Sequence, residues 1–372
     1  MDTLQMLRFF RFCSIILSLT IIINSCKDEI NTDGITHINL ERAINSPISK
    51  GPIKSHLVYN NILETDLGDE LFRNLYVKAH SEKRLYLTDY SKILIINIES
   101  GAVENIVNSR GRGPGEYMFP SSIVTTDSSV VLTDVVQRRI NEYVTDMSIC
   151  KKTIPTNNVA AVVPIDKENW AVSYINTPGR KSSLSIYSKD GKLVRESVIK
   201  NNYIESPNIR TDYLAKYKSN VYYMPAYSDT LYIVDSSIDK PEYVFHRGKY
   251  KMPMENYASL DVFHEHFNDY IQNLDYVISD DIIYVTYNYD SNVYYDIYRN
   301  DGVLLYHYKV PNESSNKGFP YTLNGTTLYL WPKYAVDNRL YCVLDSNMAQ
   351  RLLPDYEDNN KLVIIILEHI MC

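Results

Sequence analysis

The most distinctive string in the sequence is residues 110–117, Arg-Gly-Arg-Gly-Pro-Gly-Glu-Tyr, which places two guanidinium groups, a carboxylate and a phenol close together. Arg110, Arg112 and Glu116 could bind an anionic or hydroxylated ligand, because a guanidinium presents a planar fork of hydrogen-bond donors. A phosphate loop is a poor interpretation, since the string lacks a Gly-Lys-Ser/Thr ending and Pro114 has no backbone N–H to donate. The favoured alternative is structural: the glycines build a tight turn, and Glu116 satisfies the backbone of that turn.

Acidic residues follow several of the apolar runs, namely Asp89, Asp134, Asp235 and Asp345. Carboxylates at these places could bind calcium. One acid at the end of each run is more typical of side chains that accept hydrogen bonds from a turn. We therefore predict turn caps rather than metal ligands.

A second polar set has helical spacing: Asp261, His264, Glu265 and Asn268. Residues three and four apart share one helix face, so this set could hold a metal ion. However, His264-Glu265-His266 is not the His-Glu-x-x-His pattern of zinc enzymes. A solvated helix face is favoured, and neither a metal nor a cofactor is predicted.

The N-terminal residues have the features of an export signal. Arg8 and Arg11 precede a run without charge from Phe12 to Ile23. A membrane-spanning helix takes about 20 apolar residues, so this run is too short to span comfortably. It suits the core of a secretory signal peptide over residues 1–25.

The run ends in Ile23-Asn24-Ser25-Cys26, which resembles the bacterial lipobox except at Asn24. The resemblance implies that Cys26 carries lipid after the leader is removed, and two or three acyl chains at about 0.8 kcal/mol per buried methylene would anchor the chain stably. Lys27-Asp28-Glu29 is similar to the signal that sends lipoproteins of the Bacteroidota to the outer face of the outer membrane. We predict a tether over residues 26–46 and an outer-membrane, cell-surface location, with a periplasm-facing one as the alternative.

Cys13 is lost with the leader, which leaves three cysteines besides Cys26: Cys150, Cys342 and Cys372. One disulfide is compatible with an oxidising compartment, but the spacing does not identify a pair. No CxxC or Cys/His spacing supports a zinc site. Small buried hydrophobic residues are the favoured interpretation.

Length and composition limit the class of protein. The chain has 372 residues, a formal net charge of −7 and 45% hydrophobic residues. The acidity argues against a nucleic-acid binder, and the apolar fraction excludes wholesale disorder. Tyr (33) outnumbers Gly (13) and Pro (15) combined. Because Tyr favours the half-buried surface of a sheet, the composition indicates a β-rich globular protein.

The elements that must position these residues are short strands in pairs. Each pair is a strand, a polar turn and a strand, often followed by Asp-Gly or Ser-Gly, which are hairpin signals. Six pairs can be counted, at residues 84–98, 130–143, 170–187, 221–235, 282–298 and 340–367. Small sheets bury both faces when they stack around an axis. We therefore predict an all-β fold over residues 47–372, a six-bladed β-propeller of four-stranded antiparallel blades.

Two segments depart from this repeat. The stretch from Ile53 to Tyr59 has strand character and no partner of its own, so we expect it to complete the last blade and close the ring. From Met254 to Leu274 the apolar residues recur every three to four positions. This spacing predicts a helix over 254–274, inserted between blades and packed on one face of the ring.

From residue 110 onward the sequence resembles the NHL-type propeller repeat: a glycine-rich turn, Glu and an aromatic residue, Pro120, an aliphatic strand, a second strand ending in Asp134, then Arg139-Ile140. Over about residues 45–370 the chain resembles the six-bladed propeller lipoproteins of the Bacteroidota, which implies a fold and a location but no reaction. Metal-dependent six-bladed lactonases and NHL-type peptide lyases share the ring shape. A metal-dependent hydrolase or lyase with its site in the central channel is therefore the alternative function.

The sequence favours a non-enzymatic binding or scaffold module of the cell envelope, because no Ser/His/Asp set or paired carboxylates emerge. The partner would be membrane lipid at Cys26 and a glycan, a peptide or an envelope protein, not nucleic acid. The candidate ligand contacts are Arg110, Arg112, Glu116, Tyr117, Tyr227 and Tyr287. Exposed tyrosine rings stack on sugar faces, whereas cross-strand packing is the alternative for the tyrosines at 222, 223, 227, 287, 289 and 295.

Overall fold

A computed structural model of the chain describes residues 34–53, 57–67, 72, 75–175, 183–199, 212–336, 338–353 and 361–369. The expected signal peptide, Cys26 and Cys372 lie outside these residues. Within the described part of the chain, no helix is both long and apolar enough to cross a membrane.

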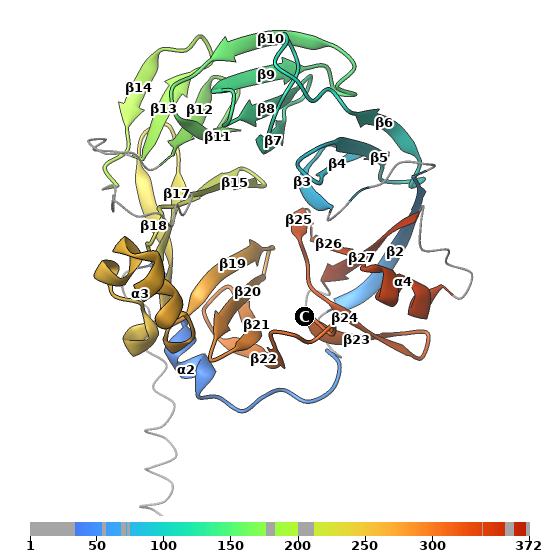
Figure 1. Cartoon of the computed structure of the whole chain (residues 1–372), viewed down its shortest axis with the longest axis vertical. Helices are drawn as coiled ribbons and strands as arrows, with labels where there is room; N and C mark the ends of the chain where they lie inside the picture. Colours follow the sequence, from blue (N-terminus) through green and yellow to red (C-terminus); the bar gives the residue numbers. More distant parts are fainter. Residues whose placement is uncertain are drawn as a thin grey trace, which may run out of the picture.

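Six antiparallel sheets stand around a central axis and form a six-bladed β-propeller (Figure 1). Blade 1 contains β3 (Tyr76–His80), β4 (Arg84–Thr88), β5 (Ile93–Asn97) and β6 (Val103–Val107). Blade 2 contains β7 (Pro120–Thr125), β8 (Val130–Asp134), β9 (Arg139–Tyr143) and β10 (Cys150–Pro155). Blade 3 contains β11 (Val159–Pro164), β12 (Asn169–Tyr174), β13 (Leu184–Ser188) and β14 (Leu193–Glu196).

The other three blades continue around the ring. Blade 4 contains β15 (Tyr213–Tyr217), β16 (Asn220–Met224), β17 (Thr230–Val234) and β18 (Asp239–His246). Blade 5 contains β19 (Gln272–Ile278), β20 (Ile282–Tyr289), β21 (Asn292–Arg299) and β22 (Leu304–Pro311). Blade 6 contains β25 (Tyr334–Val336), β26 (Arg339–Val343), β27 (Lys361–His369) and the N-terminal strand β2 (Leu57–Asp66).

The strand pairs expected from the sequence are the second and third strands of the six blades. These strands stand out because each blade is covered on both sides by its neighbours. Their side chains are therefore buried on both faces, as in β5, where Ile93 to Ile96 are all fully buried. The prediction of six four-stranded blades is confirmed.

The ring closes through strand β2, which pairs with β27 as the outermost strand of the last blade. The sequence predicts this closure, although it places the strand at 53–59 rather than 57–66. Pairing the two ends of the propeller in one sheet removes two open edges.

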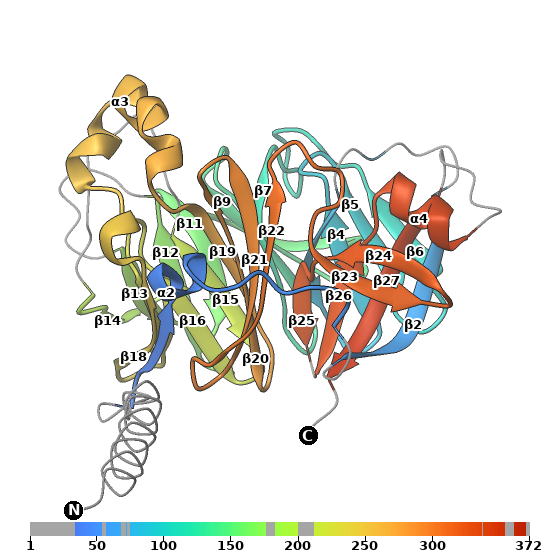
Figure 2. The ribbon, with the colours of Figure 1, turned by 90° about the horizontal axis from the view of Figure 1, so that it is seen from below.

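The chain before β2 forms a strap along the outside of the ring (Figure 2). Strand β1 (Thr36–Asn39) pairs in parallel with β18, and helix α2 (Leu40–Ile44) follows, with Asn39 as its N-cap. The strap then crosses blade 5, where the N–H of Ser49 donates to the carbonyl of His307 at 2.7 Å. Residues 36–44 fall within the predicted tether, 26–46, and the boundary of the tether stays a prediction.

The helical insertion is more broken than the sequence predicts. It consists of 3-10 turns at Gly248–Tyr250, Met254–Ala258 and Phe267–Asp269 around one short helix, α3 (Leu260–Glu265). Residues 272–274 belong to strand β19 instead. The apolar spacing persists because the insertion buries Tyr257 and Phe263 against Tyr227, in a small cluster at one face of the ring.

Two further elements lie near the last blades. The hairpin β23–β24 (Phe319–Leu323 and Thr326–Leu330) follows blade 5, and helix α4 (Ser346–Leu352) lies between β26 and β27. The hairpin contributes Phe319, Leu328 and Leu330 to the largest apolar cluster, which joins blades 5 and 6. It thereby fills the interface between these two blades.

Candidate functional site

The glycine-rich string forms a compact turn between blades 1 and 2. Arg110 and Tyr117 form a bridge, with the N–H of Gly111 donating to the carbonyl of Tyr117 at 3.0 Å. Inside the turn the N–H of Gly113 donates to a carboxylate oxygen of Glu116 at 2.5 Å. Gly115 has a φ of +73°, which favours glycine. Glu116 thus satisfies the backbone of the turn, the structural role that the sequence favours.

Buried groups of the two blades anchor this turn. The ring of Tyr117 is fully buried, and its hydroxyl donates to the carbonyl of Val107 at 2.7 Å. The hydroxyl of Tyr143 donates to the carbonyl of Gly115 at 2.7 Å, and the Asn141 amide donates to the carbonyl of Glu116 at 3.0 Å. Burial raises the pKa of Tyr143 to about 12, so this phenol stays a donor at neutral pH.

The six predicted ligand contacts do not gather at one place. Arg110 and Arg112 are exposed on the turn, whereas Tyr117 lies in the core between blades 1 and 2. Tyr227 is buried beneath the helical insertion, and Tyr287 is buried between blades 4 and 5. Their binding role stays a prediction, but the structure does not bring Tyr227 and Tyr287 to the glycine-rich turn.

Most of the tyrosines singled out as a cluster pack inside the blades. Tyr222, Tyr223, Tyr287 and Tyr295 are less than a tenth exposed, and Tyr289 is partly buried. The cross-strand interpretation is therefore confirmed for most of this set.

Three of the four acidic residues that follow apolar runs, Asp89, Asp134 and Asp235, cap turns as predicted, whereas Asp345 is the N-cap of helix α4. Asp89 accepts from the N–H groups of Ser91 and Lys92, each at 2.9 Å, and the other three carboxylates accept similar bonds. In the helical insertion, His266 contacts Asp269 at 2.9 Å. Nowhere in the described ranges do three or more His, Cys, Asp or Glu side chains form a group that could hold a metal ion.

The two cysteines within the described residues have different surroundings. Cys342 is buried in blade 6 and Cys150 is partly buried in blade 2, and neither forms a disulfide. Burial raises the pKa of the Cys342 thiol to about 12, so it behaves as a small hydrophobic residue.

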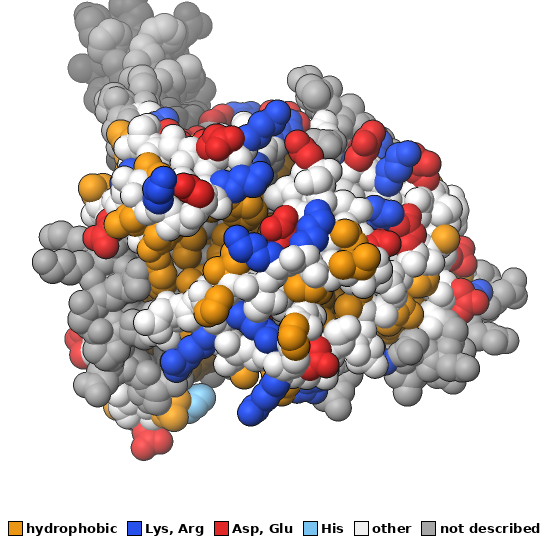
Figure 3. Space-filling view, turned by 90° about the horizontal axis from the view of Figure 1, so that it is seen from above, with side chains coloured by type: hydrophobic (Ala, Val, Ile, Leu, Met, Phe, Trp, Pro, Cys, Tyr) orange, Lys and Arg blue, Asp and Glu red, His pale blue; other side chains and the backbone are white. Residues whose placement is uncertain are grey.

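A groove with a volume of about 1600 Å³ lies between blades 2 and 3 and extends to residues 80–84 of blade 1. The innermost strands of these blades touch, and the hydroxyl of Ser121 on β7 donates to the carbonyl of Ala160 on β11 at 2.8 Å. Farther out the groove separates the two sheets (Figure 3), where hydrophobic side chains line a hollow surrounded by charged groups.

The blade 3 wall of the groove is apolar and aromatic. Trp170, Val172 and Tyr174 alternate along β12 on the face toward blade 2, as the period of a strand requires. Tyr187 lies opposite Trp170 on β13, and Tyr174 donates its hydroxyl to that of Tyr187 at 3.0 Å. Trp170 and Tyr187 are only half-buried, so both present ring surface to the groove.

The blade 2 wall is mixed. Two cross-strand pairs of β9 and β10 face blade 3: Ile140 opposite Ile154, and Glu142 opposite Lys152. Moving a charged side chain from water into an apolar interface costs several kcal/mol unless it is paired. We therefore expect Glu142 and Lys152 to favour a hydrated wall over close contact between the two sheets.

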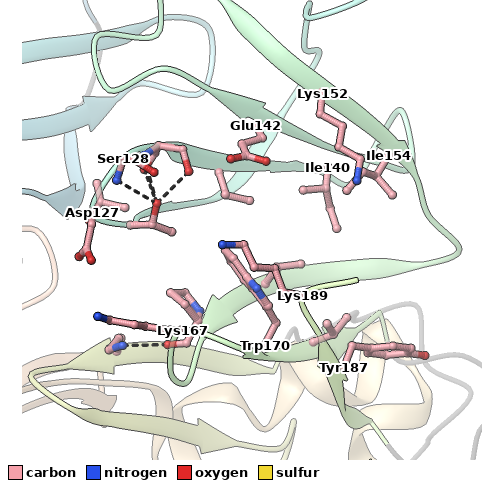
Figure 4. Close-up of a pocket in the computed structure, with 18 of the residues that line it drawn as sticks. Asp127, Ser128, Ile140, Glu142, Lys152, Ile154, Lys167, Trp170, Tyr187 and Lys189 are labelled. Carbon is pink, nitrogen blue, oxygen red and sulfur yellow. Dashed lines mark hydrogen bonds between the residues drawn. The ribbon is translucent and has the colours of Figure 1, made fainter. Parts of the chain in front are cut away.

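Charged groups surround the apolar walls (Figure 4), with Lys167 and Lys189 from blade 3 and Asp127 from blade 2. The lining carries six basic and six acidic side chains: Lys83, Arg84, Lys152, Lys167, Lys189, Lys216 and Glu82, Glu104, Asp127, Glu142, Asp166, Glu168. The groove as a whole is therefore electrically balanced and offers no strong attraction for a charged ligand.

Sequence reasoning missed this groove because it follows from a mismatch between two neighbouring blades. The available signal was the third strand of blade 2, Arg-Ile-Asn-Glu-Tyr, in which Glu142 occupies a position that faces a neighbour. In a propeller such a face is normally apolar. A charge there, opposite the Trp170 strand, indicates an interface that stays open.

Comparison with known proteins identifies a family and a fold. Residues 70–367 match the family described as "Domain of unknown function (DUF4934)". Curated protein sequences give no significant match. A Bacteroides fragilis protein described as exported has 16% identity and a TM-score of 0.65, covering 91% of this chain and 100% of its own.

Two other solved structures overlap less well. A streptogramin B lyase has 10% identity and a TM-score of 0.42, covering 85% of this chain and 98% of its own. BamB from Moraxella catarrhalis has 10% identity and a TM-score of 0.37, covering 78% of this chain and 84% of its own.

Proposed function

The chain belongs to the DUF4934 family, and from this premise we propose that it is an envelope binding protein whose groove between blades 2 and 3 holds an extended, apolar segment of a partner polypeptide. The observation that carries the proposal is the open, aromatic wall formed by Trp170, Tyr174 and Tyr187.

The size of the groove supports a polypeptide over a small molecule. Sites for small ligands measure about 300–1000 Å³, and the groove, at about 1600 Å³, exceeds that range. An extended segment presents side chains alternately to its two sides, so one row could enter between the blades.

The balance of charge supports a segment without strong net charge. Six basic and six acidic groups in the lining give no preference for a cationic or an anionic partner. Apolar side chains entering the groove would cover the exposed parts of Trp170, Tyr187 and Ile154, with a favourable transfer free energy of about 25 cal/mol per Å² of apolar area.

The cellular location rests on the N-terminus and on the similar exported protein of Bacteroides fragilis. We propose that Cys26 is the site of lipid attachment and that the outer membrane carries the propeller. Ten residues lead from Cys26 to Thr36, and ten residues span at most about 35 Å, so the ring would stay close to the lipid surface.

Peptide selection tests the binding proposal. A display library of random twelve-residue peptides is selected on the full chain, and the dissociation constants of the enriched peptides are measured by fluorescence anisotropy. We expect peptides with alternating apolar residues, at least tenfold weaker on the Trp170→Ala variant. Phe119→Ala, which removes a comparably exposed ring outside the groove, is the matched control and should change affinity less than twofold.

Two results would refute the groove as the binding site. One is that no peptide is enriched above background. The other is that enriched peptides bind Trp170→Ala as well as the original chain.

The anchor has its own test. Cells that express the full chain are fed a radiolabelled fatty acid, and the protein is isolated and counted. The original chain should carry label and Cys26→Ala should not. Label retained by Cys26→Ala would exclude this attachment site.

A further inference from the structure

The central channel has a second concave site that differs in size and charge from the groove. It measures about 830 Å³ and is lined by the innermost strands of the blades, which surround the axis in Figure 1. This volume lies within the range of small-molecule sites. The channel is therefore suited to a compact ligand.

Three aromatic rings gather at one mouth of this channel. Tyr90 stacks on Phe119 with ring centres 4.8 Å apart and planes 3° from parallel, and Tyr76 lies 5.4 Å from Tyr90. Tyr76 and Phe119 are each 38% exposed, although both are large and apolar. Exposed rings that already stack on one another offer a flat surface to a further ring.

The backbone holds these rings in place at some cost. Tyr90 has a φ of +68°, a region that residues with a side chain rarely adopt. Its N–H donates to the Thr88 hydroxyl at 2.8 Å, and the preceding Asp89 caps the same turn. Strain of this kind persists where the surroundings enforce it, and it is concentrated at functional sites.

The glycine-rich turn positions the third ring. Phe119 lies two residues after the end of the turn. The residue between them, Met118, donates its N–H to a carboxylate oxygen of Asp134 at 2.5 Å. The buried ring of Tyr117 fixes the end of the turn in the core. The glycine-rich turn, residues 110–117, therefore positions Phe119 at the channel.

A cation lies among the rings. The ammonium of Lys78 is 3.2 Å from the hydroxyl of Tyr90, and it lies 5.0 Å from the centre of the Tyr90 ring and 5.6 Å from that of Tyr76. The channel lining has four lysines, Lys78, Lys216, Lys218 and Lys333, against two aspartates, Asp212 and Asp275. The local charge thus favours an anion, in contrast to the balanced groove.

We propose that this mouth of the channel binds a small, ring-bearing carboxylate, with its ring against Tyr76, Tyr90 and Phe119 and its carboxylate at Lys78. A sugar acid and an aromatic acid share this chemistry, because both combine a flat face with one negative charge. The ammonium of Lys78 would donate a charge-assisted hydrogen bond, which is stronger than a neutral one. The channel and the groove share Lys216, but the three rings and Lys78 line the channel and not the groove. The site therefore does not depend on the proposed peptide function.

Isothermal titration calorimetry of the full chain tests the site with four probes. They are galacturonic acid, indole-3-acetate, the neutral sugar galactose and acetate, which has a charge but no ring. We expect one of the two ring carboxylates to bind at least tenfold more tightly than galactose and acetate, and more weakly as salt is added. The preferred probe identifies the source of the ring.

Variants separate this site from unspecific attraction. Lys78→Met should weaken the preferred probe at least tenfold, and Phe119→Ala at least fivefold. Lys309→Met is the matched control, because the Lys309 ammonium also lies over a tyrosine ring, at 5.5 Å from that of Tyr294, but outside the channel. It should change the affinity less than twofold, as should the groove variant Trp170→Ala.

Four outcomes would overturn the proposal. They are no binding of either ring carboxylate up to 10 mM, equal binding of galactose, equal losses in Lys78→Met and Lys309→Met, and tight binding of an acidic peptide but not of ring carboxylates. Loss of peptide binding in Trp170→Ala with ring-carboxylate binding intact would instead support both sites separately.

Discussion

The two tryptophans of the chain lie in two interfaces between blades, and the two interfaces are opposites. Trp331 lies between blades 5 and 6, is 7% exposed and has Tyr284, Tyr295 and Phe319 around it, with ring centres 4.9–6.3 Å away. Trp170 lies between blades 2 and 3 and remains partly exposed in the groove. One interface is a packed core, and the other is an open site.

The difference can be traced to the cross-strand pairs that face the next blade. In blade 5 these pairs are Tyr295 with Tyr308 and Ile297 with Tyr306. The corresponding face of blade 2 has Ile140 with Ile154 and Glu142 with Lys152. Large apolar pairs close the first interface, whereas a charged pair keeps the second hydrated.

One propeller therefore contains both a closely packed interface, between blades 5 and 6, and an open one, between blades 2 and 3. Six sheets that share a backbone pattern need not pack alike, because each interface depends on the few side chains that meet there. A binding site can arise in a propeller wherever one face carries charge, without any loop insertion.

The largest effect is expected in the packed interface. Phe319 is fully buried, so Phe319→Ala should lower the free energy of unfolding by about 3–5 kcal/mol, the usual cost of an aromatic cavity. Trp170→Ala should lower it by about 1 kcal/mol or less, because its ring is already partly in water. Urea unfolding followed by circular dichroism measures both, and equal losses would contradict the contrast between the interfaces.

The interface between blades 3 and 4 gives a pH test of packing. There Tyr223 donates to Asp212 at 2.7 Å, and the N–H of Ala226 donates at 2.8 Å. Burial outweighs these bonds and raises the pKa of Asp212 to about 6 from 3.8. The folded chain then binds more protons than the unfolded chain between about pH 4 and 6, so stability from this group is present below pH 4 and lost as the pH rises.

Between pH 4 and 7 the original chain should therefore lose about 2–3 kcal/mol of unfolding free energy relative to Asp212→Asn, as a shift of about two pKa units implies. Urea midpoints across this pH range measure the loss. On the groove side, the pKa of Asp166 lies below its usual value. Partial burial alone would raise it, but hydrogen bonds from Asn169 and Glu168 to the carboxylate outweigh that effect. Asp166→Asn should show the opposite slope, and identical slopes would contradict the assigned environments.

The turn on the other side of blade 2 should be rigid, in contrast to the groove. A Cβ on Gly115 would lie 2.6 Å from the Cβ of Cys150, and φ is already +73°. Gly115→Ala should cost about 2 kcal/mol in urea unfolding, from both strain and contact. Gly191→Ala is the matched control, since φ is +87° but nothing lies within 4 Å, and it should cost about 1 kcal/mol. A larger loss in the control would exclude the contact as a cause.

Closing the groove is the subtlest change. The double variant Glu142→Leu/Lys152→Leu should let blades 2 and 3 approach each other. It should raise the free energy of unfolding by about 1–2 kcal/mol and abolish peptide binding. Arg339 and Glu368 form a matched cross-strand pair in blade 6, with 3.0 Å between their charged groups. Leucine at both of these should give no such gain. Retained peptide binding in the groove double variant would contradict the role of the charged pair.

The sequence was sufficient for the repeated part of the fold because that part is locally encoded. The middle strands of each blade are buried on both faces, and their apolar runs and Asp-capped turns are visible without partners. Strand β1 and the hairpin β23–β24 were missed because they depend on distant partners: β1 needs β18, and Phe319 needs Trp331. The helical insertion predicted at 254–274 is present but divided into short helical turns, because its apolar spacing serves a cluster around Tyr257 and not one continuous helix.

The candidate site was harder to predict than the fold. The chemically capable residues of the glycine-rich turn were visible, but their spatial relation to Tyr227 and Tyr287 was not. Phe119 and Trp170 attract no attention as single residues, and their exposure depends on which blade lies opposite. A site made by a mismatch of two sheets is encoded in pairs of distant residues, which a single sequence does not reveal.

The most direct test of the open groove uses the emission of the two tryptophans. Trp331→Phe leaves Trp170 as the single fluorophore, and Trp170→Phe leaves Trp331. Acrylamide should quench Trp170 strongly and Trp331 weakly, and a selected groove peptide should protect Trp170 alone. Equal, weak quenching of both tryptophans, or quenching of Trp170 that the peptide leaves unchanged, would contradict the central claim.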